Sequence, residues 1–143
     1  MYKRQDFSRP SYAQNADGYF LTSPLMHWFW DSYCPPEQRG DPRASPLRGQ
    51  LQGLPPAFIA TAEFDPLRDE GQAYAQALEA AGVPVELWQG RGQMHASYTM
   101  VDMIVTANEA RSRMAQALRA FAGLPAELAA DPAAREAEAA TAS

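Results

Sequence analysis

The sequence predicts an α/β fold in which a parallel sheet of about two strands is flanked by helices. Two short apolar runs of strand length alternate with two segments that have helical periodicity. The order strand–helix–strand–helix is typical of a right-handed parallel crossover. An isolated pair of strands is at best marginally stable. We therefore expect this sheet to need further strands that the sequence does not supply.

The composition is that of a globular protein with a net negative charge. The chain has 143 residues, of which 46% are hydrophobic, and its formal net charge is -5. A negative surface repels phosphate backbones, which argues against nucleic acid as a partner. No apolar run approaches the roughly 18 residues of a membrane-spanning helix. The single cysteine, Cys34, cannot form an internal disulfide, which fits a reducing, cytoplasmic compartment.

Residues 1–22 are polar, and we predict them to be irregular because breakers such as Pro10 and Gly18 interrupt any period. A first helix is predicted to begin at Ser23, which can cap it, with Pro24 as its first full residue. Its apolar residues recur with helical spacing and form one face, which we expect to lie in the core. These residues are Met26, Phe29, Trp30 and Tyr33.

The first strand is predicted at residues 57–62, an unbroken apolar run that suits a strand covered on both faces. A helix is predicted over residues 68–81, in which Asp69 and Glu70 complement the positive helix N-terminus. Its predicted apolar stripe consists of Tyr74, Ala77, Leu78 and Ala81.

The second strand is predicted at residues 85–88, followed by a flexible turn at residues 90–92. A long helix is predicted over residues 101–122, and residues 124–143 are predicted to form a disordered tail. The predicted buried side of the long helix consists of Ile104, Ala107, Met114, Leu118 and Phe121.

Asp65 is the first candidate for chemistry, because it lies just beyond the first predicted strand. In open α/β sheets, ligands bind at the carboxyl edge of the strands. An aspartate followed by Pro66 is also a common way to cap a helix. Considered alone, Asp65 favours the capping interpretation.

His95 is the second candidate, because it follows the second predicted strand and shares an edge with Asp65 if the strands are parallel. A lone histidine is more often a surface or hydrogen-bonded residue. Together, however, an aspartate and a histidine at one edge favour an acid–base pair. The carboxylate would hold the imidazole in one tautomer and stabilise the imidazolium that forms during proton transfer.

A specific string surrounds Asp65, since residues 64–71 read Phe-Asp-Pro-Leu-Arg-Asp-Glu-Gly. Further distinctive strings are Gly-Tyr-Phe-Leu-Thr at residues 18–22 and Asp-Pro-Arg-Ala-Ser-Pro-Leu at residues 41–47. Through these strings, positions from about 11 to 123 resemble the bacterial hormone-sensitive-lipase-like carboxylesterases, which have an α/β-hydrolase fold. The order of Asp65 before His95 also matches the Ser…Asp…His order of α/β-hydrolases.

The resemblance implies that residues 23–123 are the C-terminal part of an α/β-hydrolase domain. It further implies that Asp65 is the acid of a catalytic triad and His95 its general base. The implied substrate is a small-molecule ester, with no cofactor and no metal. With two histidines and one cysteine, a structural zinc site is not expected from the residues either. The sequence leaves open whether the protein forms a homo-oligomer.

The chain departs from the family pattern directly after the histidine. The family usually has glycine and phenylalanine there, whereas this chain has Ala96 and Ser97. Ala96 adds a methyl group where the backbone needs room, and Ser97 removes an aromatic wall. We therefore expect a changed pocket shape or reduced activity.

The nucleophile motif is missing from the sequence. A serine esterase presents its serine on a strained Gly-x-Ser-x-Gly turn, and amides of a His-Gly-Gly-type run stabilise the oxyanion. No serine here has glycine two residues away on both sides, and no His-Gly-Gly run occurs. In the family both motifs precede the matched region. The sequence thus predicts an N-terminally truncated esterase that is nearly inactive by itself. We recognise no counterpart of residues 1–5 in the family, and we hypothesise that they are foreign.

Two alternatives remain open from the residues. The chain could be a non-catalytic binding or interaction module that completes its sheet on a partner, because an unpaired strand edge favours association. Alternatively, Cys34 could be a thiol nucleophile with His27 or His95 as its base. Cys34 precedes two prolines and is far from any helix N-terminus that would lower its pKa, which argues against this role.

Overall fold

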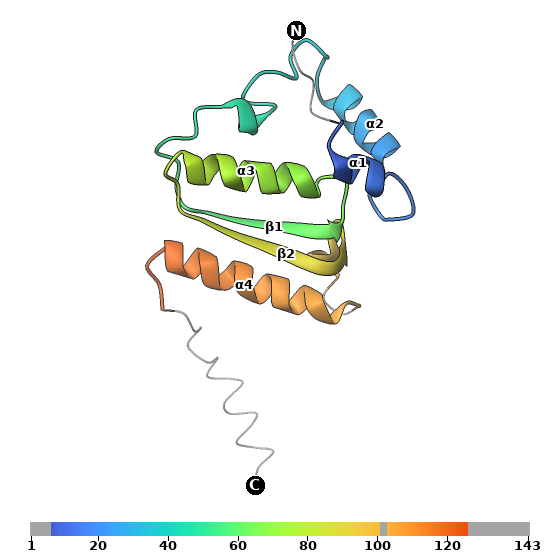
Figure 1. Ribbon diagram of the computed structural model, residues 1–143. Coiled ribbons are helices and arrows are strands. Elements are labelled where there is room, and N and C mark those ends of the chain that lie inside the picture. The colour runs from blue at the N-terminus through green and yellow to red at the C-terminus, as the bar shows by residue number, and fades with distance from the viewer. Residues whose placement is uncertain (1–6, 101–102, 126–143) are drawn as a thin grey trace.

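The computed structural model describes residues 7–100 and 103–125 (Figure 1). The predicted foreign segment at residues 1–5 and nearly all of the predicted tail lie outside the described residues. Among those described, no helix is long and apolar enough to cross a bilayer. In chain order the elements are α1 (Pro10–Gln14), α2 (Ser23–Tyr33), η1 (Pro46–Arg48), β1 (Ala57–Phe64), α3 (Arg68–Ala80), β2 (Val85–Met94), η2 (Ser97–Thr99) and α4 (Val105–Phe121).

The two strands β1 and β2 are parallel neighbours, which confirms the predicted α/β fold. Their register pairs Ala57 with Val85 at one end and Phe64 with Met94 at the other. Helix α3 covers one face of this sheet and α4 covers the other (Figure 1). The carboxyl ends of both strands therefore lie at the same edge, as an acid–base pair on them requires.

Both strands are longer than the sequence predicts. Strand β1 continues to Phe64, and β2 continues through Gly90 and Gly92 to Met94. The register shifts between Ala62 and Phe64, where β2 contains extra residues. Gly92 adopts a positive φ of 69°, which glycine tolerates at no steric cost. Its N–H donates to Glu63 Oε2 at 2.7 Å, so the irregular segment remains tied to β1. The predicted flexible turn is thus part of a bulged strand.

Helix α3 packs closely on β1 through a glycine. A Cβ on Gly71 would lie 2.7 Å from Cγ2 of Thr61, a distance that side-chain carbon atoms do not adopt. Further along α3, Leu78 is only 2% exposed and packs with Leu51 and Val83 in one core cluster. The close approach fixes α3, and with it the loop that carries Asp65, against the end of β1.

The N-terminal part differs from the predicted irregular segment, because α1 forms a short helix with Pro10 at its start. Proline suits the first helical position, where no N–H is needed. Tyr12 in this helix is buried and packs with Leu21 and Met26 of the following segment. A short helix of this kind has too few residues to show a period in the sequence.

The predicted core face of α2 is only partly correct. Met26 is buried at 8% exposure and Trp30 is half-buried against the same cluster. Phe29 and Tyr33, in contrast, are 45% and 66% exposed, so their predicted burial is wrong. The cluster contacts α2 through Met26 and Trp30, and in the described part of the chain no buried cluster includes Phe29 or Tyr33.

Helix α4 begins at Val105, and residues 101–102 of the predicted longer helix lie outside the described residues. Its buried residues are small: Ala107, Ala110 and Ala117 are 2%, 2% and 4% exposed. Leu118 and Phe121 are 59% and 39% exposed, so the prediction that they are buried is wrong. Of the predicted stripe, Ala107 is buried as predicted, and the other buried positions of the helix are the alanines at 110 and 117.

Candidate active site

Asp65 lies one residue beyond β1 and is only 6% exposed. Its Oδ1 accepts a hydrogen bond from the N–H of Leu67 at 2.8 Å, which closes a turn of the Asx type. Leu67 is the N-cap of α3 and has no side-chain cap of its own. Asp65 is therefore not the N-cap that the capping interpretation predicts, but one of its carboxylate oxygens stabilises the turn that leads into α3. The other oxygen is left for a second partner.

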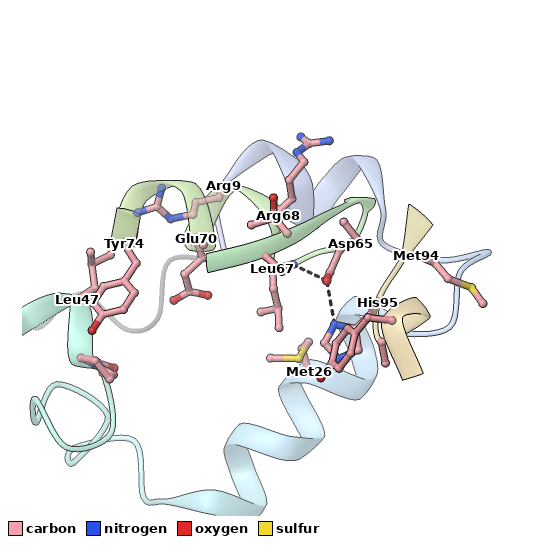
Figure 2. Close-up of a pocket in the computed structure, with 18 of the residues that line it drawn as sticks. Arg9, Met26, Leu47, Asp65, Leu67, Arg68, Glu70, Tyr74, Met94 and His95 are labelled. Atoms are coloured by element: carbon pink, nitrogen blue, oxygen red, sulfur yellow. Dashed lines mark hydrogen bonds and ion pairs between the residues drawn. The ribbon is translucent and has the colours of Figure 1, made fainter. Parts of the chain in front are cut away.

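That second partner is His95, which follows directly after β2. Its Nδ1 lies 2.8 Å from Asp65 Oδ2. A dashed line marks this contact in Figure 2. The Asp65 side chain is 9% exposed and the His95 side chain is 35% exposed. The carboxylate is therefore the inner member of the pair, and the imidazole reaches toward solvent.

The contact fixes the chemistry of the neutral imidazole. Because an ionised carboxylate accepts hydrogen bonds and cannot donate them, the proton of a neutral His95 belongs on Nδ1. Nε2 then carries the lone pair and is able to accept a proton. Within residues 7–100 and 103–125, His95 Nε2 has no hydrogen-bond partner. This is the arrangement of a general base oriented by an acid.

Asp65 and His95 line a cavity of about 710 Å³ with mainly apolar walls (Figure 2). Such a cavity can receive the hydrocarbon part of a small ligand. Cys34 and His27 are not among its lining residues, so the thiol alternative gains no support from the cavity. Residues from distant parts of the sequence form the walls, including Met26, Trp30, Tyr74, Trp88 and Met94.

Ala96, directly after His95, adopts a left-handed conformation with φ 60° and ψ 10°. It is the only described residue other than glycine with a positive φ. A left-handed L-residue costs roughly 1–2 kcal/mol, because its Cβ crowds the backbone. The resemblance placed a glycine at this position, and the strain gives the physical reason for that preference. The next residue, Ser97, is 7% exposed and lines the cavity.

Replacing Ala96 with glycine should raise the free energy of unfolding by roughly 0.5–1.5 kcal/mol, since the strain disappears while glycine adds entropy to the unfolded chain. Urea denaturation followed by circular dichroism measures this change. The matched control is Ala81→Gly at the end of α3, where φ is -85°. There glycine relieves no strain, so the control should lose stability. A loss of stability in Ala96→Gly would contradict the strain interpretation.

A set of polar residues near the site was not identified as functional from the sequence. Ser11 of α1 is fully buried, and Asn15 directly after α1 is 3% exposed. Ser11 donates its hydroxyl to the carbonyl of Pro66 at 2.6 Å, and Asn15 Nδ2 donates to the carbonyl of Asp65 at 3.2 Å. The signal in the sequence is that Ser11 and Asn15 belong to the residues that carry the family resemblance, although the resemblance assigns them no role.

Asp69 has a more specific role than complementing the helix dipole. Its Oδ2 accepts from the backbone N–H of Ser11 at 2.8 Å and its Oδ1 from Arg68 Nε at 2.9 Å. Burial opposes ionisation of Asp69, but the hydrogen bonds from Ser11 and Arg68 outweigh it and hold the pKa of this carboxyl below its ordinary value. Asp69 thus joins α1 to the first turn of α3 as a carboxylate.

The side chain of Tyr12 lies between α1 and α3 and is uncharged. Burial raises the pKa of Tyr12, and the nearby carboxylate of Glu70 raises it further. Its hydroxyl lies 3.5 Å from Glu70 Oε2 and keeps its proton at neutral pH.

In the described ranges, no three His, Cys, Asp or Glu side chains gather closely enough to hold a metal ion.

The chain is similar to known esterases over most of its length. The profile of the alpha/beta hydrolase fold family matches residues 1–99. This range includes residues 1–5 and gives no support to the hypothesis that they are foreign. Carboxylesterase NlhH of Mycobacterium tuberculosis (strain CDC 1551 / Oshkosh) is 40% identical over 119 residues, which cover 80% of this chain and 37% of that protein. Ethyl acetate hydrolase of Pseudomonas putida is 40% identical over 113 residues, which cover 78% of this chain and 36% of that protein.

The fold agrees with solved structures. The ester-hydrolase EH1AB1 from the metagenome of Lake Arreo superposes with a TM-score of 0.76 at 35% identity. The match covers 85% of this chain and 39% of that one. The chain thus spans less than two fifths of the length of these relatives. It belongs to the hormone-sensitive-lipase-like carboxylesterase family of the alpha/beta hydrolase fold, and it corresponds to part of the length of the members that it matches.

Proposed function

We propose that this chain supplies the acid and the base of a serine carboxylesterase. Asp65 orients the imidazole, and His95 moves protons between the nucleophile and the leaving group. The observation that carries this proposal is the 2.8 Å contact between His95 Nδ1 and Asp65 Oδ2 in the wall of a largely apolar cavity. Similarity to esterases supports it, because the names of the relatives, carboxylesterase and ethyl acetate hydrolase, describe proteins that act on carboxylic esters.

In the proposed reaction, His95 Nε2 accepts the proton of a serine hydroxyl while the serine oxygen attacks the ester carbonyl. The resulting imidazolium is stabilised by the Asp65 carboxylate. It then gives its proton to the departing alcohol as the carbon–oxygen bond breaks. Water, deprotonated by the same nitrogen, releases the acid from the acyl-enzyme and returns the serine to its protonated form.

We propose that the serine of this reaction lies in sequence outside the 143 residues, since no serine of the chain has the Gly-x-Ser-x-Gly pattern. We propose that the substrate is an ester with a short to medium acyl chain. The name of the Pseudomonas putida relative, ethyl acetate hydrolase, supports a short acyl group. The apolar cavity walls are consistent with an uncharged substrate.

A chimera tests this proposal. Residues 11–123 of this chain would replace the homologous segment of carboxylesterase NlhH, whose remaining sequence supplies the rest of an α/β-hydrolase domain. We expect the chimera to hydrolyse p-nitrophenyl acetate and the isolated 143-residue chain to show no turnover above buffer. Turnover by the isolated chain that disappears in His95→Ala would contradict the need for an external serine. A folded chimera without activity would contradict the esterase proposal itself.

A further inference from the structure

We propose that Ser11 and Asn15 are positioning residues for the catalytic acid, an inference that rests on the function proposed for Asp65 and His95. Both side chains come from the beginning of the described chain. Together they hold the backbone carbonyls of Asp65 and Pro66, which lie 50 or more positions away along the sequence. Neither residue touches the reacting atoms, so their effect passes through Asp65.

Two buried hydrogen bonds carry this inference. Asn15 Nδ2 donates to the Asp65 carbonyl at 3.2 Å, and Ser11 Oγ donates to the Pro66 carbonyl at 2.6 Å. Asn15 is 3% exposed and Ser11 is fully buried, so water does not replace these donors. A buried carbonyl that loses its donor costs more than an exposed one, and the backbone around it shifts to find another partner.

The loop from Asp65 to Leu67 has few anchors of its own. Pro66 has no N–H to donate, and Leu67 caps α3 without a side-chain hydrogen bond. The Asp65 carbonyl also accepts from the N–H of Arg68 at 3.1 Å, a bond within the same turn. Besides the bond between the Asp65 side chain and His95, the contacts from Ser11 and Asn15 tie this turn to a separate element, and they do so through its backbone carbonyls.

Ser11 also holds the first turn of α3. Its backbone N–H donates to Asp69 Oδ2 at 2.8 Å, and its hydroxyl accepts from the N–H of Asp69 at 3.4 Å. The turn before the helix and the helix start are thus held to one residue. General-base catalysis tolerates only displacements smaller than about 1 Å. A fixed backbone at Asp65 therefore matters for the bond between Asp65 and His95.

The experiment uses the 143-residue chain labelled with 15N, in a His27→Gln background so that His95 gives the only imidazole signals. Asn15→Ala and Ser11→Ala are compared with Gln14→Ala, which removes an exposed amide of α1 that contacts Arg68 Nη2 instead of the Asp65 turn. The first readout is the proton on His95 Nδ1 and the 15N shifts of the ring. The second is hydrogen exchange at the Leu67 amide, which donates to Asp65 Oδ1.

We expect Asn15→Ala to lower the protection of the Leu67 amide roughly tenfold, which corresponds to about 1.4 kcal/mol, and to weaken the Nδ1–H signal of His95. Ser11→Ala should act in the same direction. Protection of the Ala75 amide in the middle of α3 should stay within the range of the Gln14→Ala control. Ser11→Ala removes one oxygen atom only, so it provides a folded variant if Asn15→Ala does not fold.

The inference is overturned if both variants lower protection equally at Leu67 and Ala75 while the His95 ring signals stay unchanged. That result would assign Ser11 and Asn15 to stability alone. The test does not depend on esterase activity. An inactive chimera with an intact effect of Asn15→Ala on His95 would remove the proposed function and keep the positioning role, whereas an active chimera with no such effect would do the reverse.

Discussion

In the NlhH chimera, His95→Ala should lower kcat for p-nitrophenyl acetate by at least roughly 10³-fold. Without the imidazole, no group takes the proton from the serine hydroxyl, and no acid protonates the leaving alcohol. Because His95 is 35% exposed in its side chain and lies at the wall of a cavity, its removal should leave the fold nearly intact. Stopped-flow or steady-state absorbance at increasing substrate concentration separates kcat from KM.

The matched control for this prediction is His27→Ala. His27 is exposed, stacks on the ring of Phe7 and does not line the cavity. It should keep the kcat of the parent chimera. Circular dichroism of both variants confirms that they fold alike. A His95→Ala chimera that retains more than a tenth of the parental kcat would mean that another group acts as the base.

Asp65→Asn should lower kcat by roughly 10²–10⁴-fold with little change in KM. The asparagine oxygen can still accept from the Leu67 N–H at the position of Oδ1, so the turn before α3 persists. Its amide nitrogen, however, faces His95 Nδ1 as a donor. The imidazole is then driven to the tautomer with the proton on Nε2, which is unable to accept a proton from serine.

The tautomer is measured directly in the isolated chain. The 15N shifts of His95 should show a protonated Nδ1 in the parent and a protonated Nε2 in Asp65→Asn at neutral to alkaline pH. Asp17→Asn, which removes an exposed carboxylate outside the cavity, is the control and should leave both the tautomer and the chimera's kcat unchanged. An unchanged tautomer together with a large loss of kcat would show that Asp65 acts in another way.

Local signals in the sequence were sufficient for the order and type of the main elements. The apolar run after residue 56 is β1, and the segment from Arg68 is α3 with only a one-residue difference at its end. Apolar periodicity was less reliable for the faces of helices. In α2 and α4 it assigned Phe29, Tyr33, Leu118 and Phe121 to the core, whereas the structure leaves them exposed. Burial depends on which neighbours reach a face, and the sequence of one helix does not contain that information.

The pairing of Asp65 and His95 was predictable because two parallel strands end at one edge and each is followed by a residue of triad type. By itself, the sequence thus determined the fold class, the two candidate residues and the family strings that surround Asp65. Tertiary structure alone decided the 2.8 Å contact between them, the left-handed conformation of Ala96 and the hold of Ser11 and Asn15 on the acid. These features join atoms that are 30 or more residues apart or depend on a backbone conformation, and neither is encoded in residue spacing.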